Sequence, residues 1–220
     1  MFNFFEKSDE QIQIDVMNEL KFDPSVTATH ISVSCKDGVV SLRGTVPHYF
    51  ERESAEQASQ RVGGVRAVAD ELIVKVMGPY EKGDDEIAAA ASNALEWNVS
   101  VPKSVKVSVD NGWVTLRGEV QWDYQRQAAK RAVSSLLGVC GVKNEIKVES
   151  QASTTEVLKN IQAAFKRAAE KEGKNISVRV SGNKVTLTGK VHSFSDLAEA
   201  GVAAWNTPGV GEVVNHLSIQ

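Results

Sequence analysis

The sequence predicts an α+β fold of three tandem αββαβ modules, each with a small mixed three-stranded sheet and two helices on one face. A short strand that begins at a tight turn and ends at a glycine occurs three times, at residues 37–44, 111–118 and 182–189. A Gly-Val pair follows each strand, and both landmarks recur at the same offsets of 74 and 71 residues. The chain therefore repeats one module of about seventy residues.

Each repeated strand begins at a residue pair that favours a two-residue hairpin. The pairs are Asp37-Gly38, Asn111-Gly112 and Gly182-Asn183. These residue types tolerate the positive φ that such turns require. Apolar and polar residues then alternate, which predicts one face toward a core and a polar face toward solvent or a neighbouring module.

The first helix of each module is expected from an apolar stripe at helical spacing. In module one, Ser8 is the expected N-cap, and the stripe is Ile12, Val16 and Leu20. The stripe recurs in module two, and module three is expected to open with a longer helix at Thr154.

An aromatic residue follows the first helix in two modules. Trp97 matches Phe22, and we expect it to plug the core at the helix exit rather than to bind a partner.

A second, alanine-rich helix joins the second strand to the third. Such a crossover makes these two strands parallel, whereas the hairpin strands are antiparallel. The expected boundaries are modules at 8–76, 84–149 and 153–220, with linkers at 77–83 and 150–152.

Eight glycines at hairpins, strand ends and helix ends are expected to be structural. They are Gly38, Gly44, Gly64, Gly112, Gly118, Gly138, Gly189 and Gly209.

The composition excludes several classes of protein. A net charge of −3 argues against general nucleic-acid binding. No apolar run approaches the ~18 residues of a membrane span. The N-terminus lacks the features of a secretory signal, so we expect a cytoplasmic protein or a mature form. Cys35 is expected in the core, and no disulfide to Cys140 is expected.

The repeated motifs resemble those of the BON domain family. The motifs are Leu42-Arg43-Gly44, Leu116-Arg117-Gly118 and Leu187-Thr188-Gly189, followed by Gly64-Val65 to Leu72, Gly138-Val139 to Ile146 and Gly209-Val210 to Leu217. The resemblance implies the αββαβ fold and a bacterial, non-enzymatic module. It also implies a periplasmic or envelope location, a link to osmotic stress, and binding to phospholipid surfaces or other proteins. This chain has three copies where two are usual, and it shows no export signal.

Catalytic chemistry is not indicated by the residues. The four histidines occupy non-equivalent positions, and the glycines form neither a Walker A nor a dinucleotide motif. No Cys/His metal spacing is present, so no cofactor and no metal are expected.

One cluster breaks the repeat. Trp113, Trp122, Tyr124, Arg126 and Lys130 occur in module two where the other modules have different residues. Aromatic and basic side chains together suit a lipid headgroup interface or a protein hot spot. The alternative is packing between modules. The sequence therefore favours a module that binds an anionic phospholipid membrane surface, and a protein-interaction or chaperone-like scaffold remains the alternative.

Overall fold

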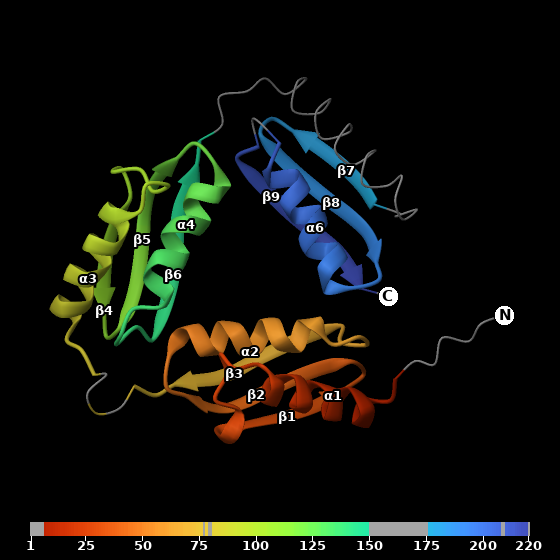
Figure 1. The fold of residues 1–220 in the computed structure, drawn as a ribbon. Helices are drawn as coiled ribbons and strands as arrows, with labels where there is room; N and C mark the ends of the chain where they lie inside the picture. Colours follow the sequence, from red (N-terminus) through yellow and green to blue (C-terminus); the bar gives the residue numbers. More distant parts are fainter. Residues whose placement is uncertain (1–6, 77, 79–80, 150–175, 208–209, 220) are drawn as a thin grey trace.

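Three separate three-stranded sheets make up the computed structural model (Figure 1). The residues described are 7–76, 78, 81–149, 176–207 and 210–219. Module one consists of α1 (Asp9–Phe22), a short 3-10 helix η1 (Ala28–His30), β1 (Ile31–Lys36), β2 (Val39–Val46), α2 (Tyr49–Arg61) and β3 (Ala67–Val74). Module two consists of α3 (Asp84–Trp97), β4 (Lys106–Asp110), β5 (Trp113–Val120), α4 (Asp123–Ser134) and β6 (Gly141–Val148).

Module three consists of β7 (Ile176–Ser181), β8 (Lys184–Val191), α6 (Phe194–Trp205) and β9 (Glu212–Ile219). The helix expected from Thr154 and the expected structural glycine Gly209 lie outside the described residues.

The strand order is the same in every module. The middle strand pairs antiparallel with the first and parallel with the third, as in β1-β2-β3. The other two sheets repeat this arrangement. The predicted α+β fold of repeated modules is confirmed.

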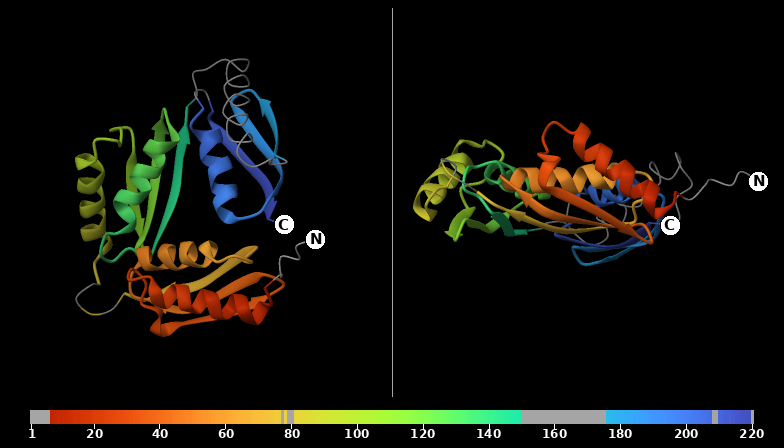
Figure 2. Two further views of the ribbon diagram at one scale, coloured as in Figure 1. Left: turned by 45° about the vertical axis from the view of Figure 1, so that its right-hand side comes forward. Right: turned by 90° about the horizontal axis from the view of Figure 1, so that it is seen from below.

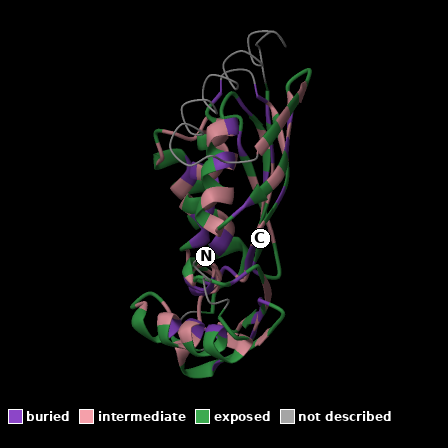
Figure 3. Ribbon diagram, turned by 90° about the vertical axis from the view of Figure 1, so that its right-hand side faces the viewer, coloured by how far each residue is buried: buried purple, intermediate pink, exposed green. Residues whose placement is uncertain are grey.

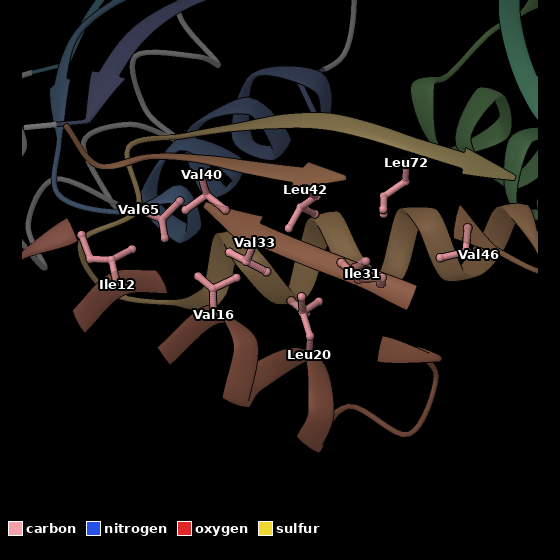
Figure 4. Packing of buried hydrophobic residues seen from close by; sticks show 12 residues of the cluster. Ile12, Val16, Leu20, Ile31, Val33, Val40, Leu42, Val46, Val65 and Leu72 are labelled. Carbon is pink, nitrogen blue, oxygen red and sulfur yellow. The ribbon is translucent and has the colours of Figure 1, made fainter. Parts of the chain in front are cut away.

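Each core lies between one face of the sheet and its helices. In module one, Ile12, Val16 and Leu20 of α1 pack against β-strand residues such as Val40 and Leu42 (Figure 4). All five are at most 3% exposed. Buried residues therefore line the inner sides of the elements, and exposed residues line the outer sides (Figure 3).

The first helix is tied to the hairpin by an aspartate. The Asp9 carboxylate accepts hydrogen bonds from the backbone N–H groups of Asp37 and Gly38, at 2.8 and 2.9 Å. The turn has positive φ at both residues, 52° and 73°. Asp84 makes the same two bonds to Asn111 and Gly112 in module two. The hydrogen bonds of these two aspartates to the hairpin turns were not predicted from the sequence.

At Gly44 the backbone of β2 closely approaches the backbone that leads into β1. The φ of Gly44 is 131°, and a Cβ there would overlap the carbonyl oxygen of His30. Only glycine allows β1 and β2 to pair at this point.

The expectation that Trp97 plugs the core is wrong. Trp97 is 89% exposed and Phe22 is 86% exposed. Trp97 follows Leu95 by two residues, about 200° around the helix, so it faces away when Leu95 faces the core. Leu95 and Val105 are buried in the core near this exit instead.

Candidate functional site

Each module has two ends, which we define by where the strands of its sheet begin and finish. The hairpin end carries the turn between the first two strands, and the far end lies where the second strand finishes. β5 runs from Trp113 at the hairpin end to Val120 at the far end. Eight strand residues span about 23 Å. Trp113 therefore lies at one end of module two, and Trp122 and Tyr124 lie at the other. The three rings of the cluster therefore do not share one end of the module.

Trp113 lies at the joint between modules one and two. Its ring covers Gly141, its partner on β6, so closely that a Cβ on that glycine would clash with the ring. The side chain is 50% exposed. It lines a cleft of about 260 Å³ together with Tyr49 of α2 and Lys130 of α4.

Lys130 is also used in this joint. Its Nζ lies 2.6 Å from Oε1 of Glu53 in α2. Burial opposes the charged form of Lys130, but the hydrogen bond and charge of Glu53 outweigh it, so the pKa of Lys130 is raised. Tyr49 packs against the core of module two. These contacts join α2 to α4.

Arg126 lies at the next joint, between modules two and three. Its guanidinium is 4.4 Å from the ring centroid of Trp205 in α6, and it forms an ion pair with Asp123. A cation over an indole face is favourable electrostatically. Trp205 also packs against the cores of both modules. The two bases of the predicted cluster thus contact neighbouring modules within the chain.

Two rings of the predicted cluster remain at the far end of module two. Trp122 is 37% exposed and Tyr124 is 56% exposed. α3 starts beside the hairpin at Asp84 and, over fourteen residues, rises about 20 Å. Trp97 therefore ends α3 at the same far end, and the exposed Val99 follows it. We call Trp97, Val99, Trp122 and Tyr124 the far-end apolar group.

The loop that follows α3 is held against the end of β5. The hydroxyl of Ser104 donates to the backbone carbonyl of Glu119 at 2.7 Å. This bond fixes the loop of Val99 beside the strand that leads to Trp122. Sequence reasoning missed Trp97 and Val99, although the helical phase of Trp97 was a usable signal.

Reactive groups in the described part of the chain do not form a catalytic arrangement. Burial is the main cause that raises the pKa of the Cys35 thiol to about 11, and the hydrogen bond and charge of Asp9 raise it further. Burial also raises the pKa of Cys140, and both cysteines are free. Among the described residues, no three His, Cys, Asp or Glu side chains are grouped to hold a metal. Within the same residues, no helix combines the length and apolarity needed to cross a membrane.

Comparison with protein families matches three stretches of the chain to the BON domain, at residues 8–76, 83–150 and 153–220. The chain belongs to the BON domain family. Its three BON modules correspond to the three sheets.

One curated relative of this BON protein is the osmotically-inducible protein Y of Escherichia coli (strain K12). It is 30% identical over 147 residues, which cover 64% of this chain and 73% of that protein.

Two solved structures also match. CdsD, a structural protein of the type III secretion system of Chlamydia trachomatis, is 13% identical, with 94% of this chain and 91% of that chain covered and a TM-score of 0.27. The PrgH periplasmic domain is 10% identical, with 94% and 99% covered and a TM-score of 0.22.

Proposed function

We propose that this BON protein acts by binding, without a chemical step, and that it attaches to the surface of a phospholipid membrane through the far-end apolar group. The observation that carries the proposal is the exposure of Trp97, 89%, beside that of Val99, 101%. The name of a related protein, osmotically-inducible protein Y, supports a role under osmotic stress. We further propose a location at the cell envelope. The comparisons give no support to the cytoplasmic location expected from the N-terminus.

The chemistry of the group suits a lipid interface. Tryptophan and tyrosine combine an apolar ring with a polar N–H or O–H, and they collect where hydrocarbon meets water. The exposed Lys103 lies in the loop that follows α3, as Val99 does, and its positive charge suits an anionic headgroup. Burying an aromatic side chain fully contributes roughly 1.5–3 kcal/mol. Three such rings would support weak, reversible attachment.

The outer sheet faces are less suited to this role. Arg43 and Glu71 pair across β2 and β3 at 2.8 Å, and Arg117 and Glu145 pair equivalently in module two at 2.7 Å. Charge pairs therefore occupy these faces, and exposed apolar side chains such as Ile73, at 65%, stand beside them. The far end of module two is therefore the favoured attachment point.

The test is binding of the full chain to vesicles of phosphatidylglycerol and phosphatidylcholine, measured by sedimentation. The double variant Trp97→Ser, Trp122→Ser should lose at least about tenfold in affinity, because two rings no longer enter the interface. Trp113→Ser, at the hairpin end, is the matched control and should bind as the natural chain does. Equal binding by the double variant would contradict the proposal, as would binding only to another protein and not to vesicles.

A further inference from the structure

The three modules contact one another head to tail. The far end of each module meets the hairpin end of another module: one meets two, two meets three, and three meets one. The second helices α2, α4 and α6 all face the middle of the molecule (Figures 1 and 2). A head-to-tail contact that closes on itself makes a ring.

Equivalent positions make two of these contacts. Tyr49 and Phe194 are the first residues of α2 and α6. Tyr49 packs against the core of module two, and Phe194 packs against the core of module one. The same helix start therefore reaches into the next module at the first joint and at the third.

The second joint has the same polarity. Val148, the last residue of β6 at the far end of module two, lies against Gly211, which precedes β9 at the hairpin end of module three. A Cβ on Gly211 would come within 3.0 Å of the Val148 carbonyl oxygen. Arg126 over Trp205 adds to this joint.

The third joint, between modules three and one, closes the ring. Leu197 of α6 and Ile219 of β9 line a cleft of about 370 Å³ with Val39 and Arg66 of module one. Val39 begins β2 and is 41% exposed. This joint differs from the first in one respect, because modules one and two are consecutive in the chain whereas modules three and one are not.

A joint without a direct covalent link can open without straining the backbone. Opening would uncover Phe194 and Leu197 on one side and Val39 on the other, which are apolar groups now covered at least in part. The surface that fits them best is the same surface on another molecule, since its contacts already exist within this chain. Exchange of identical elements is a low-barrier route to dimers.

We propose that the hairpin end of module one is an interaction surface for module three of a second copy of this chain. In the exchanged dimer each chain contributes module three to its partner's third joint, with the contacts of Phe194 and Val39 unchanged. The closed monomer and the exchanged dimer are then in equilibrium, and the dimer is favoured at high protein concentration.

The test mixes tagged and untagged full-length chains at high concentration in sub-denaturing urea and returns them to buffer. Capture of the tagged chain should retain untagged chain, and light scattering should show a dimer. Phe194→Ser should speed the exchange by about tenfold, because the closed joint loses a buried ring and opens more often. The dimer fraction at equilibrium should stay nearly unchanged, because the closed monomer and the exchanged dimer lose the same contact. Val39→Ser changes the other side of the joint and should act in the same direction.

Phe22→Ser is the matched control, because Phe22 is 86% exposed at the end of α1 and lies outside the third joint. It should exchange as the natural chain does. A natural chain that stays monomeric at every concentration would overturn the proposal. So would an exchange that neither Phe194→Ser nor Val39→Ser accelerates.

Discussion

Oδ1 of Asp9 lies 2.9 Å from the backbone nitrogen of Gly38, and this bond joins the start of α1 to the turn between β1 and β2. Asp84 and Gly112 form the same bond at the same distance in module two. In modules one and two, a pair of residues far apart in sequence thus fixes the hairpin end. That end receives the neighbouring module in each joint.

The hydrogen bonds from Gly38 and Asp37 lower the pKa of Asp9 below its usual value of 3.8. A carboxyl whose pKa is lowered in the folded state stabilises the fold at pH values above its usual pKa. This stabilisation is lost as the pH falls through the folded-state pKa. Asp9→Asn should therefore lower the urea midpoint at neutral pH, and the difference from the natural chain should shrink below about pH 4. Glu10→Gln, an exposed acid of the same turn, is the control. A constant difference at all pH values would exclude this role for Asp9.

Thiol reactivity offers a second check on the same carboxylate. The Cys35 thiol donates to Asp9 at 3.3 Å, and burial together with Asp9 raises its pKa to about 11. Cys35 should label slowly with a thiol reagent near neutral pH, because the thiolate is the reactive form. Asp9→Asn should speed labelling of Cys35 and leave Cys140 unchanged. Rapid labelling of Cys35 in the natural chain would show that the strand register is wrong.

Gly44→Ala should destabilise module one by at least about 2 kcal/mol, because a positive φ and a backbone overlap act together. The overlap is with the carbonyl oxygen of His30, at a φ of 131°. Gly63→Ala is the matched control, since a Cβ there meets nothing within 4 Å. Urea unfolding measures both variants. Equal stability of the two would contradict the close strand approach at Gly44.

The ion pair between Glu53 and Lys130 should contribute to the first joint. Their side chains are 25% and 34% exposed, so a double-mutant cycle with Glu53→Gln and Lys130→Gln should give a coupling of about 0.5 kcal/mol that falls at high salt. The pair Arg43–Glu71, 62% and 52% exposed, is the control and should show almost none. Equal coupling in both pairs would contradict the view that the first joint shields the Glu53–Lys130 ion pair from solvent.

Local periodicity was enough to predict the modules. The alternation that places Val40 and Leu42 inside, and the stripe through Ile12, Val16 and Leu20, depend on neighbours within one segment. The aspartates of the hairpin end left a signal as well. Asp9 and Asp84 each begin a first helix, so their recurrence was a usable signal for a shared partner, although the hydrogen bonds to the turn were not predicted.

The candidate site was harder to predict because it depends on contacts between segments distant in sequence. The sequence does not indicate that Arg126 meets Trp205 or that Lys130 meets Glu53. It does contain the length of β5, which separates Trp113 from Trp122, and the helical phase that turns Trp97 outward. Standard strand and helix geometry would have been enough to predict both of these features from the sequence.

Quenching of tryptophan fluorescence by brominated phospholipid vesicles tests the proposed attachment most directly. One variant keeps Trp97 and replaces Trp113, Trp122 and Trp205 by Phe, and a second keeps only Trp113. The account predicts a blue shift and strong quenching of Trp97, with little change at Trp113. An unquenched Trp97 in a chain that sediments with the vesicles, or stronger quenching of Trp113, would contradict attachment through the far end of module two.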